Sequence, residues 1–89
     1  MENILSLEER ILTARFALMG FDDLLDETNK IMGKISKEEI TDVNKTPYLY
    51  CLNEFVDRLD SRKVDEKLQE QVNLMKKSVK KRILYLECI

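Results

Sequence analysis

The most constraining feature of this sequence is a long run of regularly spaced apolar residues in its first half. Between residues 7 and 35 they recur at alternating intervals of four and three, and only Thr28 among them is polar. This seam consists of Leu7, Ile11, Ala14, Leu18, Phe21, Leu25, Thr28, Met32 and Ile35. Such spacing places every member on one side of an α-helix, as in coiled coils. The chain is therefore expected to fold as helices that pack along this seam.

Capping signals mark where the first helix should begin and end. Ser6 and Glu9 form a capping box, in which the serine hydroxyl accepts from the backbone N–H of the glutamate. The seam passes Gly20 without a phase slip, so one continuous helix is expected over residues 7–32. Gly33 then stands where a C-cap glycine belongs.

Three further helices are expected after this one. Ser36 and Glu39 repeat the capping box and predict a short helix with Ile40 and Val43 facing inward. Thr46 followed by Pro47 predicts the start of a third helix, over residues 47–59. Its expected inward residues are Tyr48, Leu52, Phe55, Val56 and Leu59.

The last helix is expected over residues 62–87, after a tight turn at 60–63 where the apolar phase breaks. No residue type in that turn forbids a continuous helix, so this boundary stays open. The expected inward residues of the last helix are Val64, Leu68, Val72, Met75, Val79, Ile83 and Leu86.

Composition supports a single helical domain covering residues 1–89. The 89 residues are 44% hydrophobic and 36% charged, with only two glycines and one proline, so turn-forming residues are scarce. The fold class expected is all-α: a small antiparallel bundle of long, short, medium and long helices with coiled-coil-like packing.

The two long helices carry more apolar residues than one core-facing stripe needs. In the first helix, Leu12, Phe16 and Met19 lie off the seam, and Leu84 and Tyr85 do so in the last. These residues either widen the core or form an interface with a partner or a second copy. The interface hypothesis uses these five residues, with the two aromatic side chains as anchors.

Charge is unevenly distributed along the chain. Residues 1–60 carry a net −6 and residues 61–89 a net +4. The basic cluster consists of Lys76, Lys77, Lys80, Lys81 and Arg82. Cations near a helix C-terminus complement the macrodipole, but the cluster also suggests an alternative function, salt-dependent nucleic-acid binding by a regulator. The sequence pI near 5.2 argues against a dedicated nucleic-acid binder.

An acidic face is expected on the first helix, formed by Asp22, Asp23, Asp26 and Glu27. It is interpreted as a solvated face or a docking surface for a basic partner. No metal is expected there, because bundle iron sites need histidine and the EF-hand pattern is missing.

The chain has no histidine, which removes the commonest general base and metal ligand. No arrangement of nucleophile, base and orienting group is visible, so neither an enzyme nor a cofactor is expected. Cys51 and Cys88 have no metal-site or redox-motif spacing, so both thiols are expected to be reduced. Together with the acidic start and the lack of a long apolar run, this predicts a cytoplasmic protein that does not enter membranes.

The function expected is therefore interaction with another macromolecule, by a small non-enzymatic protein that also self-associates. Compact acidic chains of this size often serve as inhibitors, antitoxins, immunity proteins or adaptors, including those of phages and mobile elements. A homo-oligomer that binds a ligand between its subunits is a further alternative. The partner and the number of subunits are left open.

Overall fold

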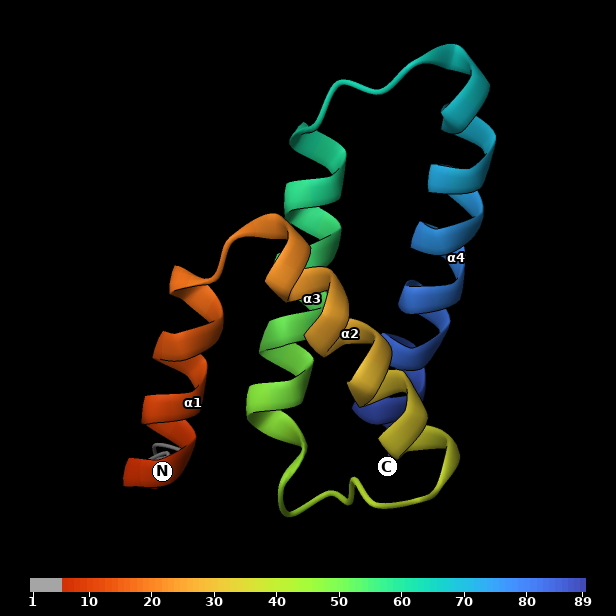
Figure 1. Cartoon of the computed structure of the whole chain (residues 1–89). Coiled ribbons are helices and arrows are strands. Elements are labelled where there is room, and N and C mark those ends of the chain that lie inside the picture. The colour runs from red at the N-terminus through yellow and green to blue at the C-terminus, as the bar shows by residue number, and fades with distance from the viewer. Residues whose placement is uncertain (1–5) are drawn as a thin grey trace.

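The computed structural model describes residues 6–89, and the regular secondary structure of this part is entirely helical (Figure 1). The helices are α1 (Leu7–Leu18), α2 (Phe21–Ser36), α3 (Lys45–Ser61) and α4 (Glu66–Cys88). The all-helical class expected from the sequence is confirmed, and these helices pack against one another.

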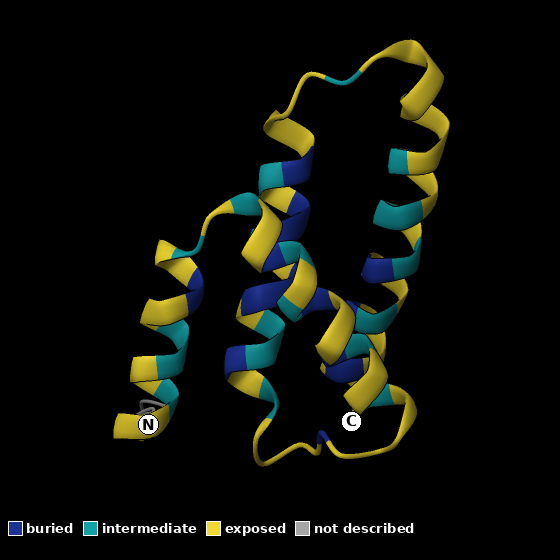
Figure 2. Ribbon diagram, in the orientation of Figure 1, coloured by how far each residue is buried: buried dark blue, intermediate teal, exposed yellow. Residues whose placement is uncertain are grey.

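The helix at the centre of the structure is α3. Helices α1, α2 and α4 all pack against it, and α2 also contacts α4. Figure 1 shows α1 and α4 on opposite sides of α3. Figure 2 shows the buried residues gathered along α3 and on the half of α4 that lies beside α2. The buried core consists of Phe16, Leu24, Ile31, Ile40, Cys51, Leu52, Phe55, Val56, Leu59, Val79, Ile83 and Leu86.

The start of the first helix agrees with the expected capping box. The backbone N–H of Glu9 donates to the Ser6 hydroxyl at 3.2 Å. The hydroxyl in turn donates to the Glu9 carboxylate at 3.1 Å. The helix therefore begins directly after Ser6, with one of its unpaired N–H groups satisfied.

The expected continuous helix over residues 7–32 is wrong, because the chain breaks at Met19 and Gly20 into α1 and α2. Both residues are extended, with ψ angles of 143° and 164°. The seam residues keep their spacing in the sequence through this break. Because the chain changes direction there, the half of the seam on α1 and the half on α2 face different surroundings. Leu18 is exposed on α1, whereas Thr28 is buried on α2.

The expected end of the first helix and the expected short helix after it are also wrong. Helix α2 passes through Gly33 and ends at Ser36, whose hydroxyl donates to a carbonyl of the preceding turn at 3.2 Å. Glu38 adopts the left-handed conformation with φ 58°, and the backbone N–H of Glu39 donates to the Lys34 carbonyl at 2.9 Å. This is a Schellman ending, which more often uses glycine.

Residues 37–44 form turns and irregular backbone between α2 and α3. Ile40 is buried in the core, as expected for an inward residue. Val43 was expected to face inward with it, but its side chain is exposed. One apolar residue thus anchors this link to the bundle.

The third helix matches the sequence in its position and its buried side. Of its expected inward residues, all but Tyr48 are buried, and Tyr48 is half-buried. The helix begins slightly earlier than expected, which puts Pro47 inside the first turn, where its missing N–H costs no hydrogen bond. Residues 62–65 separate α3 from α4, so the chain is not one continuous helix here. The expected tight turn at 60–63 needs correction, because Asp60 and Ser61 belong to α3 and Arg62 after them is extended.

The two halves of α4 differ in packing. Val79, Ile83 and Leu86 are buried in its C-terminal half. Residues 66–71 are all exposed, including Leu68, which was expected to face inward. Among the helices described, none has the length and apolar content needed to cross a membrane.

Candidate functional site

Helix α1 is apolar on two sides. The inner stripe, defined as Leu12, Phe16 and Met19, packs against the core, and Phe16 is only 1% exposed. The outer stripe is defined as Leu7, Ile11, Ala14 and Leu18, the first four members of the seam. Its large side chains are exposed by 69%, 61% and 88% for Leu7, Ile11 and Leu18. Ala14 between them is exposed too.

The geometry of the helix separates the two stripes. At about 3.6 residues per turn, the centres of the inner and outer stripes lie roughly 140° apart around the helix axis. Glu8 and Arg15 occupy the flank on one side of the outer stripe, and Arg10 and Ala17 occupy the other. The outer stripe is thus a narrow apolar band bordered by charged residues.

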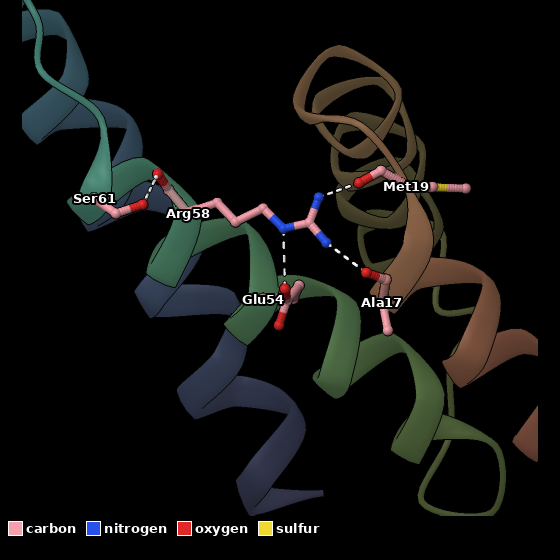
Figure 3. A network of polar contacts seen from close by, with 5 residues as sticks. All are labelled: Ala17, Met19, Glu54, Arg58 and Ser61. Atoms are coloured by element: carbon pink, nitrogen blue, oxygen red, sulfur yellow. Dashed lines mark hydrogen bonds and ion pairs between the residues drawn. The ribbon is translucent and has the colours of Figure 1, made fainter.

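One arginine of α3 fixes the end of α1 beside it (Figure 3). The Arg58 guanidinium donates to the Ala17 carbonyl at 2.7 Å and to the Met19 carbonyl. Its Nε atom also donates to the Glu54 carboxylate at 2.9 Å. These carbonyls have no partner within α1, because a helix leaves its last C=O groups unpaired. A positive charge at this end also complements the helix dipole.

Aromatic contacts hold the start of α2 against the same end of α3. The rings of Phe21 and Phe55 stack with their centroids 5.6 Å apart. The Arg62 guanidinium lies over the Phe21 ring at 4.0 Å from its centroid, a cation–π geometry. The elbow, defined as the break between α1 and α2 at Met19 and Gly20, is therefore held in place by α3. These contacts also fix the orientation of α1, and so the direction in which the outer stripe faces.

The expected interface residues are divided between the core and the surface. Phe16 belongs to the core, and Leu12 and Met19 are partly buried against it, so the inner stripe is not an exposed face and the part of the interface hypothesis placed on it needs correction. Leu84 and Tyr85 of α4 are exposed, by 62% and 46%. Since α3 lies between α1 and α4, the structure does not bring the two halves of the expected interface together (Figure 1).

The acidic face lies on α2, and part of it borders the outer stripe. Asp23, Asp26 and Glu27 line a surface hollow of about 480 Å³ together with Arg15, Leu18, Met19 and Lys30. Asp22 is exposed but does not line this hollow. Glu27 accepts from Arg15 at 3.1 Å and lies 3.8 Å from the Lys30 ammonium. The acidic face is therefore partly neutralised by these two cations.

The basic cluster of α4 lines two hollows, which share Lys81. The four lysines line one of about 370 Å³ with Asn73 and Leu84. Arg82 lines another with Tyr85, and its guanidinium donates to the Ser78 carbonyl and hydroxyl. Lys76 pairs with Asp60 at 2.7 Å, and this hydrogen bond lowers the pKa of the Asp60 carboxyl. Lys76 and Arg82 are thus partly engaged in contacts within the chain, whereas Lys77, Lys80 and Lys81 are exposed.

Both cysteines are free thiols, in opposite environments. Cys51 is fully buried on α3, and burial raises the pKa of its thiol to about 12, an effect that the Thr28 side chain opposes in part. Cys88 is exposed at the end of α4. Only the thiolate is an effective nucleophile, so Cys51 is chemically inert in the folded chain.

We expect alkylation by iodoacetamide at pH 8 to distinguish these thiols. The native protein should gain a single adduct, at Cys88, and a second should appear only in denaturant, because Cys51 is then exposed and recovers its ordinary pKa. Mass spectrometry of time points gives both rates. Equal rates for the two thiols in the native protein would contradict the burial of Cys51.

Within residues 6–89, no group of three or more Cys, Asp or Glu side chains is arranged to hold a metal ion. Comparison with known protein families, curated proteins and solved structures finds no match to this chain.

The residues of the outer stripe are visible in the sequence as the start of the seam, but the seam pattern predicts that they lie in the core. The role of Arg58 has no local sequence signal, because its acceptors lie 39 and 41 residues away.

Proposed function

We propose that this protein acts without catalysis, by binding another protein chain through the outer stripe of α1. The observation that carries this proposal is that one short helix has its inner stripe in the core and three large apolar side chains exposed on another side. Soluble proteins seldom leave a contiguous apolar surface in water unless it is an interaction site. Inhibitors, immunity proteins and adaptors are classes of protein that can act in this way.

The spacing of the outer stripe suits recognition by a helix. Its members follow one another at intervals of four, three and four residues, the pattern by which helices pack into grooves or against other helices. Coiled-coil-like packing would then be made between chains at this stripe. An antiparallel bundle with coiled-coil-like packing inside the chain stays a prediction.

Charge beside the stripe would assist association. The acidic face adjoins the outer stripe at the hollow that Leu18 and Arg15 share with Asp23 and Asp26. Charged residues around an apolar contact speed encounter and select among partners.

The state of the two cysteines bears on the location of the protein. Both thiols are free, which fits a reducing compartment such as the cytoplasm.

Replacing two of the three large exposed side chains of the stripe tests this proposal. The double variant Ile11→Gln, Leu18→Gln removes apolar surface but keeps good helix formers and the net charge. We expect the complexes formed by the tagged wild-type protein in its host, with itself or with another protein, to be lost. Crosslinking followed by mass spectrometry measures this loss. The free energy of unfolding should change by less than about 1 kcal/mol, because both side chains are exposed.

The chain offers a matched control on another helix. Leu74 and Leu84 of α4 are each 62% exposed, so Leu74→Gln, Leu84→Gln removes a similar apolar surface away from α1. This control variant should keep every complex. If the outer-stripe variant kept every complex as well, the proposed function would be wrong.

A further inference from the structure

We infer that the outer stripe binds a second copy of this chain, with the two α1 helices side by side in opposite directions about a twofold axis. This inference rests on the proposed function and names its partner. It is carried by the order of side-chain sizes along the stripe and by the charges on its two flanks. Homodimers about a twofold axis are the commonest soluble assemblies.

The sizes of the stripe residues fit an antiparallel pair. When two such stripes face each other in opposite directions, the first residue of one meets the last residue of the other. Leu7 then lies against Leu18 of the partner subunit, and Ile11 lies against Ala14 of the partner subunit. Each central layer combines a large and a small side chain, which allows the helix axes to approach closely.

The charges on one flank favour the same direction. In an antiparallel coiled coil, residues on one flank meet residues of the same flank in the partner. Glu8 therefore meets Arg15 of the partner subunit, and the twofold axis makes this opposite-charge pair twice. On the other flank, Arg10 meets Ala17 of the partner subunit, which is uncharged.

A parallel pair would be unfavourable by the same reasoning. In that arrangement each flank meets the opposite flank of the partner, so Arg10 would lie beside Arg15 of the partner subunit, again twice. Like charges at such positions select against the arrangement that brings them together. The sequence of α1 thus discriminates between the two directions.

The contacts that Arg15 makes within its own chain leave it able to bind across the interface. One Nη atom donates to Glu27 at 3.1 Å, and 57% of the side chain is exposed. A guanidinium carries five N–H donors, so a second carboxylate can be accepted without breaking the first contact. Lys30, at 3.8 Å, also stays with Glu27.

The size of the stripe predicts a weak dimer. A helix of 12 residues is about 18 Å long, and one stripe along it covers less than the roughly 800 Å² per partner of a standard interface. We therefore expect a dissociation constant on the order of micromolar or weaker, with association rising over the accessible range of protein concentration.

Charge reversal tests the direction of the pair. Sedimentation equilibrium of the full chain at low salt compares the wild type with Glu8→Arg, Arg15→Glu and the double reversal. Each single variant replaces two attractive pairs by two repulsive ones, so dimerisation should weaken about ten-fold. The double variant restores both pairs and should recover wild-type affinity to within about two-fold.

The double variant also separates an interface effect from damage to the fold. It still lacks the Arg15–Glu27 pair within the chain, and it still carries a cation in the first turn of α1, where an acid is preferred. Recovery of dimerisation can then come only from pairs between chains. In high salt, the differences among the four proteins should shrink, because exposed charge pairs are screened.

Three results would overturn the inference, each in a recognisable way. Stronger dimerisation of Arg15→Glu alone would show a parallel pair. Dimerisation that is unchanged in Ile11→Gln, Leu18→Gln would place the dimer interface away from α1. A wild-type protein that stays monomeric at millimolar concentration would exclude a second copy as the partner. In that last case the proposed function still stands if the outer-stripe variant loses a complex with a different protein.

Discussion

Replacing Phe16 by alanine is expected to lower the free energy of unfolding by about 3 to 5 kcal/mol. The ring is 1% exposed and belongs to the core, so truncation removes apolar contacts and leaves a cavity between α1 and α3. Folded proteins are stable by only about 5 to 15 kcal/mol, so this loss is a large fraction of the total stability. Denaturant unfolding followed by circular dichroism measures the change.

The matched control for this substitution lies on the same helix. Ile11→Ala removes an apolar side chain that is 61% exposed, and it should change the free energy of unfolding by less than about 1 kcal/mol. The difference between the free energies of unfolding of the two variants thus shows which stripe is buried and which is exposed. Equal losses in Phe16→Ala and Ile11→Ala would contradict the placement of α1 on α3.

The second large effect is expected at Arg58. Arg58→Ala should lower the free energy of unfolding by about 2 to 3 kcal/mol, because hydrogen bonds to charged groups contribute about 1.5 to 3 kcal/mol each and water can replace part of this half-buried set. The variant leaves the last carbonyls of α1 and the Glu54 carboxylate without their partner. Hydrogen exchange should report faster opening of α1 than of α3.

A lysine at position 58 provides the control for charge. Arg58→Lys keeps the cation near the C-terminus of α1, but its single ammonium cannot reproduce the planar fork that spans two carbonyls and Glu54. We expect a loss about half that of Arg58→Ala. If both variants were as stable as the wild type, Arg58 would not be what holds the elbow.

Sequence periodicity predicted the helices that one apolar stripe defines. In α3 the inward residues Leu52, Phe55 and Leu59 are buried as expected, because one continuous apolar side leaves a single way to pack. The C-terminal half of α4 follows the same rule. The capping box at Ser6 also located the start of α1 correctly, since it depends only on local contacts.

Apolar periodicity did not predict the helix boundaries where a continuous helix and a broken one have the same apolar spacing. The seam continues through Met19 and Gly20 in phase, so no local pattern reveals that the backbone there is extended. The break is stabilised by Arg58, which is distant in sequence. Similarly, Ser36 and Glu39 make a plausible capping box, but the Schellman ending of α2 at Glu38 takes its place.

The candidate site shows the same limit. Both stripes of α1 have apolar residues at intervals of four and three, so the sequence does not say which of them faces α3. Burying the inner stripe removes the large ring of Phe16 from water, whereas the outer stripe includes the small Ala14. The choice depends on the shape of the core, which sequence spacing alone does not contain.

The two stripes of α1 also bear on how such a protein could change over generations. Since Phe16 and Ile11 point in different directions from one helix, substitutions at the two positions should have nearly additive effects. A mutation in the outer stripe can alter the choice of partner while leaving the fold intact, and a mutation in the inner stripe does the reverse. Selection can therefore act on recognition without first having to find a compensating change in the core. Because the core of this chain is small, keeping the residues for recognition apart from the residues for folding lets more positions change without loss of the fold.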